Sequence, residues 1–210
     1  MARPVRLLVG LGNPGRRYAA TRHNAGAWLA DRLAAKLSLD FRSESRFGSA
    51  VARGHAGEGP DFMLALPQRY MNESGQAVAA LARYFRIEVP EILVAHDELD
   101  LKPGSVKLKL GGGSAGHNGL KDIVEQLGEN GFWRLRIGIG HPRDAQVTEQ
   151  EVADYVLHPP RAEEKTLIDE AIARALAVWP DLAAGDTERA MLALHTRPKA
   201  PPGKKETPSA

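Results

Sequence analysis

VRLLVGLGNPGRRYAATRHNAG, residues Val5–Gly26, combines a short apolar run, a Gly/Pro turn and the start of a helical pattern. The apolar run, which ends at the turn that begins at Gly12, is typical of a buried strand. The pattern becomes helical from Ala25 onward, so His23 lies on the connection between a strand and a helix. Open α/β sheets bind ligands in the crevice at the carboxyl ends of their strands. We therefore expect His23 to border a functional site.

Three glycines in this stretch, Gly10, Gly12 and Gly15, match the G-x-G-x-x-G spacing of dinucleotide-binding folds. That fingerprint requires a helix that opens at the third glycine and an acidic residue at the end of a second strand. Here Pro14 and the polar residues after it delay the helix, and Asp31 falls within a helical pattern. The context therefore disfavours a nicotinamide or flavin site.

The composition of the 210-residue chain fits one α/β domain that is long enough to bury a sizeable core. The chain contains no cysteine, which excludes disulfides and thiolate chemistry. No apolar stretch approaches the length of a membrane span, and the run after Arg6 is too short for a signal peptide. The expected location is therefore the cytoplasm, and no membrane partner is expected.

Positive charge is unevenly distributed, although the formal net charge is only +2. Residues 102–143 contain seven basic and three acidic residues, and residues 197–210 contain four basic and one acidic. A local basic face suits a phosphate backbone. Charge alone fits a solvated surface equally well.

Helical and strand patterns alternate along the chain, which predicts an α/β fold: a single domain with a twisted, mixed β-sheet flanked by helices. Strands are expected at Phe47–Arg53, Phe62–Leu66, Glu91–Ala95, Ser105–Leu110 and Arg134–Gly140, the first two as a hairpin lying off the parallel core. Helices are expected at Ala25–Leu37, from Asn72 to Phe85, from Asn118 to Gly128, and at Ala162–Trp179 and Thr187–Leu194. Residues 1–196 would form the catalytic domain, and residues 197–210 a Pro/Lys-rich disordered tail.

The strand expected at Ser105–Leu110 has a clear alternation of apolar and basic residues. Val106, Leu108 and Leu110 would face the core, which leaves Lys107 and Lys109 on the solvent side. The glycine-rich loop after this strand leads directly to Asn118. We therefore expect the two lysines to lie beside the site and to contact a phosphate backbone, with Arg136 as a weaker candidate.

Polar side chains mark the boundaries between the predicted elements. Four of them are asparagines: Asn13, Asn24, Asn72 and Asn118. Each asparagine alone fits a helix cap or a turn. Together with His23 and with Asp97, which follows a buried strand, they fit a hydrolytic site. A histidine can take a proton from water, a carboxylate can fix its tautomer, and neutral amides can hold a carbonyl or an oxyanion.

A second motif, Gly112-x-Ser114-x-Gly116, matches the G-x-S-x-G nucleophile elbow of α/β-hydrolases. Its partners would be sought among His141, His158 and His195, with Asp144 or Asp154 as the acid. The strand before this motif carries two lysines, whereas the elbow strand is buried. A non-catalytic RNA-binding module is a further alternative; it explains the lysines but not the histidine, aspartate and amides.

Six motifs, in order and spacing, resemble those of bacterial peptidyl-tRNA hydrolases. They are GLGNPG (10–15), TRHNAG (21–26), YMNESG (70–75), AHDELD (95–100), GGGSAGHNGL (111–120) and RIGIGHP (136–142). The resemblance extends from about Val5 to Leu194 and does not include the tail. The chain departs from the family at Tyr70, where phenylalanine is common, and at Ser114-Ala115, where the glycine loop often has a histidine.

The resemblance implies a monomeric esterase, without cofactor or metal, that cleaves the bond between a peptide and the 3′ end of tRNA and so recycles the tRNA. It implies that His23 is the general base and that Asp97 keeps it in its basic form. The implied substrate contacts are Asn13, Tyr18, Tyr70, Met71, Asn72, His117 and Asn118. Asn13 would help to distinguish a blocked amino end from a free one.

Overall fold

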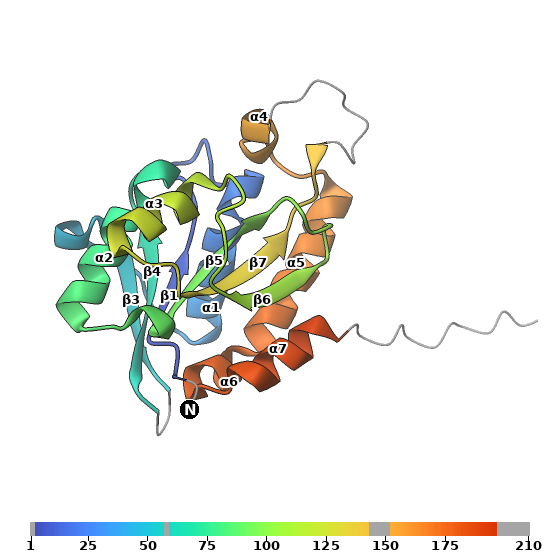
Figure 1. Ribbon diagram of the computed structural model, residues 1–210. Coiled ribbons are helices and arrows are strands. Elements are labelled where there is room, and N and C mark those ends of the chain that lie inside the picture. The colour runs from blue at the N-terminus through green and yellow to red at the C-terminus, as the bar shows by residue number, and fades with distance from the viewer. Residues whose placement is uncertain (1–2, 57–58, 143–151, 197–210) are drawn as a thin grey trace, which may run out of the picture.

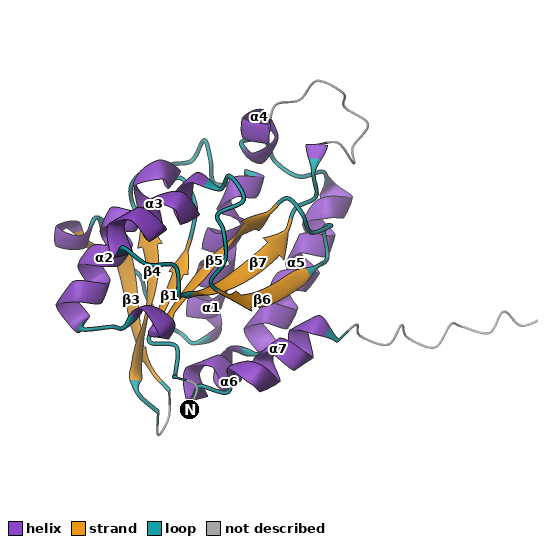
Figure 2. Ribbon diagram, in the orientation of Figure 1, coloured by secondary structure: helices purple, strands orange, loops and turns teal. Residues whose placement is uncertain are grey.

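The computed structural model describes residues 3–56, 59–142 and 152–196 (Figure 1). The predicted disordered tail, residues 197–210, and Asp144 lie outside the described residues. Within them the chain forms one mixed, seven-stranded sheet with helices on both faces (Figure 2). The predicted fold class is confirmed.

The sheet has the strand order β2-β3-β4-β1-β5-β7-β6. The strands are β1 (Leu7–Gly10), β2 (Arg42–Glu44), β3 (Ser49–His55), β4 (Asp61–Pro67), β5 (Ile92–Glu98), β6 (Val106–Leu110) and β7 (Trp133–Gly138). Strands β4, β1, β5 and β7 are parallel neighbours, whereas β2, β3 and β6 join through antiparallel pairs. The carboxyl ends of the four parallel strands therefore lie along one edge, where the site is found.

Two helical layers cover the sheet. One contains α1 (Ala25–Lys36), α5 (Ala162–Ala177), α6 (Trp179–Ala184) and α7 (Thr187–His195), and the other contains α2 (Ser74–Phe85) and α3 (Asn118–Leu127). Leu8 packs in the first layer, and Leu7 and Val9 pack in the second. A strand buried on both faces needs apolar residues at every position, which is why β1 is a continuous apolar run.

One sequence prediction about element placement is wrong, and one helix was not predicted. The hairpin of β3 and β4 does not lie off the parallel core, because β4 is inserted between β3 and β1 and pairs with β1 in parallel. The helix expected at Ala162–Trp179 is α5, which ends at Ala177, and a separate helix, α6, begins at Trp179. Pro180 lies in the first turn of α6, where it suits a helix start and interrupts a helix interior.

Strand β6 is an edge strand, and its two faces follow the predicted alternation except at its last residue. Lys107 and Lys109 are exposed, and Val106 and Leu108 are buried. Leu110, expected in the core, is 51% exposed because the edge strand ends there. Nε2 of His195 in α7 accepts a hydrogen bond from the backbone N–H of Leu108 (3.2 Å), which holds this edge in place.

No helix among the described residues is long and apolar enough to cross a membrane.

Candidate active site

The site forms where the carboxyl ends of β1 and β5 meet the first turn of α3. His23 lies in a 3₁₀ turn, Arg22–Asn24, between β1 and α1. Gly26 allows this connection to approach β5, because a Cβ on Gly26 would overlap the carbonyl group of Ala95. That close approach brings His23 next to Asp97, near the end of β5.

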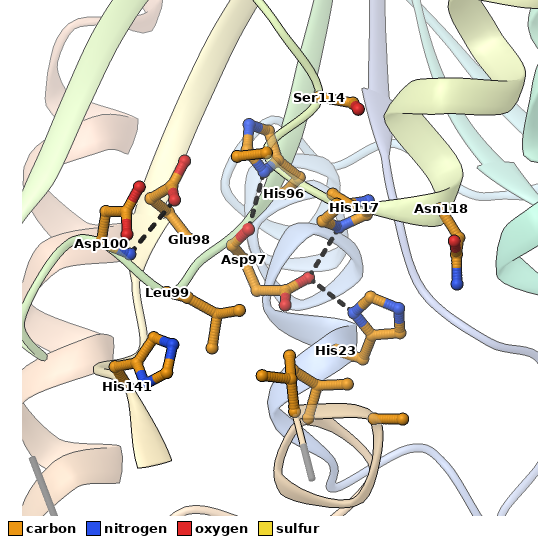
Figure 3. Close-up of a pocket in the computed structure, with 15 residues that line it drawn as sticks. His23, His96, Asp97, Glu98, Leu99, Asp100, Ser114, His117, Asn118 and His141 are labelled. Carbon is orange, nitrogen blue, oxygen red and sulfur yellow. Dashed lines mark hydrogen bonds and ion pairs between the residues drawn. The ribbon is translucent and has the colours of Figure 1, made fainter. Parts of the chain in front are cut away.

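Asp97 is shared by two histidines (Figure 3). Its Oδ1 lies 2.9 Å from Nδ1 of His23 and 3.0 Å from Nε2 of His117. His117 is the N-cap of α3, and its Nδ1 accepts a hydrogen bond from the backbone N–H of Leu120. The proton of neutral His117 is therefore on Nε2, which donates to Asp97. We call His23, Asp97 and His117 the trio.

The charge of the buried carboxylate determines the protonation of its neighbours. Burial would lower the pKa of His23, but the charge of Asp97 and its hydrogen bond outweigh burial and raise the pKa. Burial would raise the pKa of Asp97, but His23 and His117 hold it well below its usual range. The carboxylate stays ionised at neutral pH, and His23 is a stronger base than an isolated histidine.

His96 lies behind the trio and remains neutral. Complete burial, then the neighbouring His117, lower the pKa of His96 to about 3. Its Nδ1 lies 2.7 Å from the backbone oxygen of Asp97 and donates to it, which holds the backbone of Asp97 in place. A third buried imidazole thus contributes no positive charge that would weaken the basicity of His23.

A second group of contacts holds Asn13 beside the trio. The backbone N–H of Asn13 donates to Oδ1 of Asn24 (2.9 Å), and Nδ2 of Asn24 donates to the backbone oxygen of Asn13 (3.0 Å). Oδ1 of Asn13 accepts from the backbone N–H of Met71 (2.8 Å). Because its oxygen is engaged, the amide group of Asn13 is orientated as a hydrogen-bond donor.

Met71, which contacts this asparagine, is preceded in the chain by Tyr70, and Tyr70 meets Tyr18. Met71 is buried, and a Cβ on Gly119 would lie only 2.6 Å from its sulfur, so the first turn of α3 packs directly on it. The rings of Tyr18 and Tyr70 meet edge to face, with centroids 6.4 Å apart, and Tyr70 is 59% exposed. An exposed aromatic pair of this kind can stack on a base or a sugar.

A cavity of about 550 Å³ opens onto the trio. Its lining includes the trio, His96, residues 98–100, the loop 114–116, Asn118, His141 and three apolar residues of α4 (Val152–Val156). Asn118 therefore shares the cavity with His23, as predicted. Asn13 instead lines a neighbouring hollow of about 250 Å³, and Asn72 is an exposed residue of the turn before α2.

A further cavity of about 330 Å³ adjoins the first and is lined in part by Lys109 and Arg136. Both cavities touch His96, Glu98, Asp100, Ser114 and Ala115. Arg136 is paired with Glu98 (2.8 Å). Arg134, two residues before Arg136 on β7, is buried and donates to the carbonyl oxygens of Gly112 and Gly113. It anchors the glycine loop, a role that its sequence position did not signal.

The nucleophile-elbow interpretation of Ser114 is wrong on topology. The strand before it is the antiparallel edge strand β6, whereas an elbow follows a buried parallel strand. Two of the histidines proposed as its partner are engaged elsewhere: His195 with Leu108, and His158 with the backbone oxygen of Asp154.

We accordingly expect Ser114→Ala to retain most of the hydrolase activity, because no step of the chemistry uses the hydroxyl. Serine-directed acylating reagents should leave the enzyme active. The check is turnover before and after such a reagent, together with an intact-mass measurement. A covalent adduct on Ser114 that accompanies loss of activity would contradict this expectation.

The trio is also a set of possible metal ligands. One ligand atom from each of His23, Asp97 and His117 lies within 4.8 Å of the others. Two imidazoles and one carboxylate are a donor set that zinc accepts. A metal ion bound there would replace the two protons that now join the imidazoles to Asp97. With a metal ion on Nδ1, the proton of neutral His23 would lie on Nε2, so metal binding and acceptance of a proton by Nε2 exclude each other.

The sheet topology and the buried histidine–carboxylate trio define the class: a single-domain α/β protein with side chains suited to acid–base chemistry at the carboxyl edge of its sheet. The family model for peptidyl-tRNA hydrolase matches residues 7–202. The chain belongs to the peptidyl-tRNA hydrolase family, and it hydrolyses peptidyl-tRNA. The dehydrogenase, α/β-hydrolase and non-catalytic alternatives are thereby excluded.

Relatives support this assignment along nearly the whole chain. The peptidyl-tRNA hydrolase of Azoarcus sp. (strain BH72) is 56% identical over 197 residues, which cover 94% of this chain and 87% of that protein. A crystal structure of a peptidyl-tRNA hydrolase in complex with N-propanol is 43% identical, with a TM-score of 0.87, and covers 93% of this chain and 97% of its own. The peptidyl-tRNA hydrolase of Acinetobacter baumannii is 42% identical, with a TM-score of 0.85, over 92% and 97% of the two chains.

Proposed function

We propose that His23 is the general base that activates water for hydrolysis of the ester bond between the peptide and the 3′ end of tRNA. The observation that carries the proposal is the bond between Nδ1 of His23 and the buried carboxylate of Asp97. Because Nδ1 holds its proton toward Asp97, the Nε2 atom of neutral His23 is an acceptor. His23 lines the cavity, where a water molecule can reach it.

The reaction needs neither a covalent intermediate nor a metal. Nε2 of His23 takes a proton from water while the water oxygen attacks the ester carbonyl carbon, which becomes tetrahedral and negatively charged. The intermediate collapses, the bond to the ribose 3′ oxygen breaks, and the imidazolium gives its proton to that leaving oxygen. Asp97 stabilises the imidazolium between these two transfers.

Neutral amides are suited to hold the rest of the ester. Asn118 borders the same cavity as His23, and we assign it to the carbonyl oxygen or to the oxyanion that develops from it. Asn13 lies on the other side of the connection that carries His23, with its Nδ2 as a donor. We assign it to the acyl carbonyl that only a blocked amino end provides. We assign Tyr18, Tyr70, Met71 and Asn72 to the surroundings of the adenosine and the first peptide unit.

The experiment that tests the proposed function compares release of free tRNA from an N-acetylated and a free aminoacyl-tRNA. We expect the blocked substrate to be strongly preferred, because a neutral amide donor binds an acyl carbonyl and gains nothing from an ammonium group. Asn13→Asp should reduce this preference, since a carboxylate attracts the ammonium. Asn118→Asp is the matched control, and there we expect lower activity on both substrates. An unchanged ratio of the two kcat/KM values in Asn13→Asp would remove Asn13 from this role.

We propose that the tRNA backbone lies along the exposed face of β6. Lys107 and Lys109 are solvent-facing, and Lys109 also lines the cavity that adjoins the trio. Arg136 is a weaker candidate because Glu98 neutralises it. The alternative is that the lysines only keep an edge strand soluble. The two interpretations differ in the salt dependence of binding.

Lys107→Ala combined with Lys109→Ala should raise KM for tRNA substrates. It should also flatten the slope of log affinity against log salt, by roughly 0.7–0.9 for each lost phosphate contact. Hydrolysis of a short ester substrate without the tRNA body should be almost unchanged. Lys36→Ala with Lys165→Ala, on α1 and α5, removes the same charge elsewhere and serves as control. Equal losses on long and short substrates would contradict a role in RNA binding.

We further propose that the active form is a monomer without a metal ion and that it acts in the cytoplasm. One chain supplies all three members of the trio, so a second copy is not needed to complete the site. Peptidyl-tRNA arises during translation, which places the reaction where ribosomes work. The mass of the active species in solution and its activity in the presence of a chelator test the first two statements.

A further inference from the structure

Arg22, the residue before His23, is a buried arginine whose guanidinium group points away from the trio toward the segment 155–164. It is only 5% exposed. Nη1 lies within hydrogen-bond distance of three backbone oxygens, those of Tyr155 (3.3 Å), His158 (3.2 Å) and Pro159 (3.0 Å). Nη2 donates to Oε2 of Glu164 (2.7 Å). Its buried Nε has no hydrogen-bond partner among the described residues, so the two terminal nitrogens make all of its hydrogen bonds with this segment. A buried arginine whose terminal nitrogens are engaged in this way stabilises a specific arrangement of the segment around it.

The guanidinium group stabilises the C-terminal end of α4 (Val152–Val156) in two ways, by hydrogen bonds to carbonyl oxygens and by its positive charge. Helix ends leave carbonyl oxygens without partners, and a cation near the C-terminus also favours the helix dipole. The guanidinium carbon lies 4.1 Å from the ring centroid of Tyr155, so Arg22 stacks on α4 as well as binding its end. The backbone N–H of Arg22 adds a hydrogen bond to the carbonyl oxygen of His158 (3.1 Å).

Helix α4 forms a wall of the catalytic cavity. Val152, Ala153 and Val156 line the cavity together with the trio. A helix of five residues has little stability of its own, because helix nucleation is unfavourable. Its placement must therefore come from tertiary contacts. Among the described residues these include Arg22, the packing of Tyr155 and Val156 in the core, and the hydrogen bond from the Tyr155 hydroxyl to the carbonyl oxygen of Ile139 (2.8 Å).

We propose that Arg22 is a positioning residue that fixes α4 against the turn Arg22–Asn24 and thereby sets how tightly the substrate is bound in the cavity. This inference rests on the proposed function. The wall is apolar and provides no group for proton transfer, so it contacts the bound substrate and the transition state alike. Interactions of that kind change KM and leave kcat nearly constant. The hydrogen bonds of the guanidinium group go to residues 155–164 and not to His23 or Asp97, so we expect the His23–Asp97 contact to be retained.

The test compares Arg22→Lys and Arg22→Ala with wild type on an N-acetylated aminoacyl-tRNA. Lysine keeps the charge beside Glu164 but has one nitrogen, which cannot reach the helix carbonyls and the carboxylate together. We expect KM to rise roughly tenfold in Arg22→Lys and further in Arg22→Ala, with kcat changed less than about threefold. The acidic midpoint of the pH profile, which reports His23, should stay in place. Backbone amides of residues 152–158 should exchange hydrogen faster.

The matched control is Arg32→Lys. Arg32 in α1 donates to Asp169 in α5 (2.6 Å), so it also links the N-terminal part of the chain to the C-terminal helices, but away from the cavity. The Arg32→Lys variant should change neither KM nor the hydrogen exchange of the backbone amides of residues 152–158. A fall in kcat at constant KM in the Arg22 variants, or exchange unchanged from wild type, would overturn the proposal. A wild-type chain without hydrolase activity would instead refute the proposed function, and hydrogen exchange would still report whether Arg22 holds α4.

A second variant covers the case in which the Arg22 variants do not fold. Tyr155→Phe removes the hydroxyl that binds the carbonyl oxygen of Ile139 and keeps the buried ring. It removes a second contact that holds the same helix and leaves Arg22 and the turn Arg22–Asn24 in place. We expect it to raise KM and to accelerate exchange over the same residues. If KM and exchange both remain at their wild-type values, the placement of α4 does not control substrate binding.

Discussion

Replacing His23 with alanine is expected to lower kcat/KM for peptidyl-tRNA by about 10²–10⁴-fold, the usual contribution of a general base. The variant loses the one ring nitrogen that can take the proton of water while its other nitrogen is held by Asp97. The fold should remain intact because His117 still binds Asp97, so the buried carboxylate keeps a hydrogen-bond donor. Turnover and the thermal unfolding midpoint are measured on the same preparation.

The matched control for this variant is His55→Ala. Nδ1 of His55 lies 2.7 Å from Oδ1 of Asp61, so this pair repeats the His–Asp contact in the exposed hairpin of β3 and β4, away from the cavity. We expect its activity to equal that of wild type. If His23→Ala turned over at a near-normal rate, the assignment of the general base would have to be abandoned.

The position of the turn Arg22–Asn24, which carries His23, could be predicted from the sequence because its signals are local. The apolar run, the Gly/Pro turn and the helical pattern from Ala25 placed His23 between β1 and α1 without information from the rest of the chain. Asp97 could be predicted for the same reason, since it follows a second buried apolar run. Parallel strands bring their carboxyl ends together, so two local patterns predicted one shared edge.

The features that the sequence did not predict depend on contacts between distant segments. Arg22 and Arg134 are both buried, although arginine is almost always predicted to be exposed. Each is buried because it binds backbone carbonyl groups. Arg22 binds those of residues 155–159, and Arg134 binds those of the glycine loop. The place of β4 was missed because a hairpin pattern fixes only the pairing of β3 with β4. The parallel pairing of β4 with β1 depends on the whole sheet.

Asp97→Asn is expected to lower kcat/KM on the order of 10²-fold, less than the roughly 10⁴-fold that the corresponding change costs a serine-protease triad. The amide can still occupy the place between His23 and His117, but it carries no charge to stabilise the imidazolium. The charge of Asp97 raises the pKa of His23 above its ordinary value of 6.5. The proposed base is neutral His23, so the wild-type rate should fall as the pH drops through that raised pKa.

The pH profile therefore distinguishes the proposed role of Asp97 from a purely structural one. Without the carboxylate, burial alone acts on His23 and lowers its pKa, so the acidic limb of kcat/KM should move to lower pH in Asp97→Asn while the maximum decreases. Asp169→Asn is the matched control, because Asp169 also binds two cationic side chains, Arg32 and Lys165, outside the cavity. It should leave both the maximum and the midpoint unchanged. A reduced maximum with the acidic limb in its wild-type position would show that Asp97 supports the fold of the site and does not tune its base.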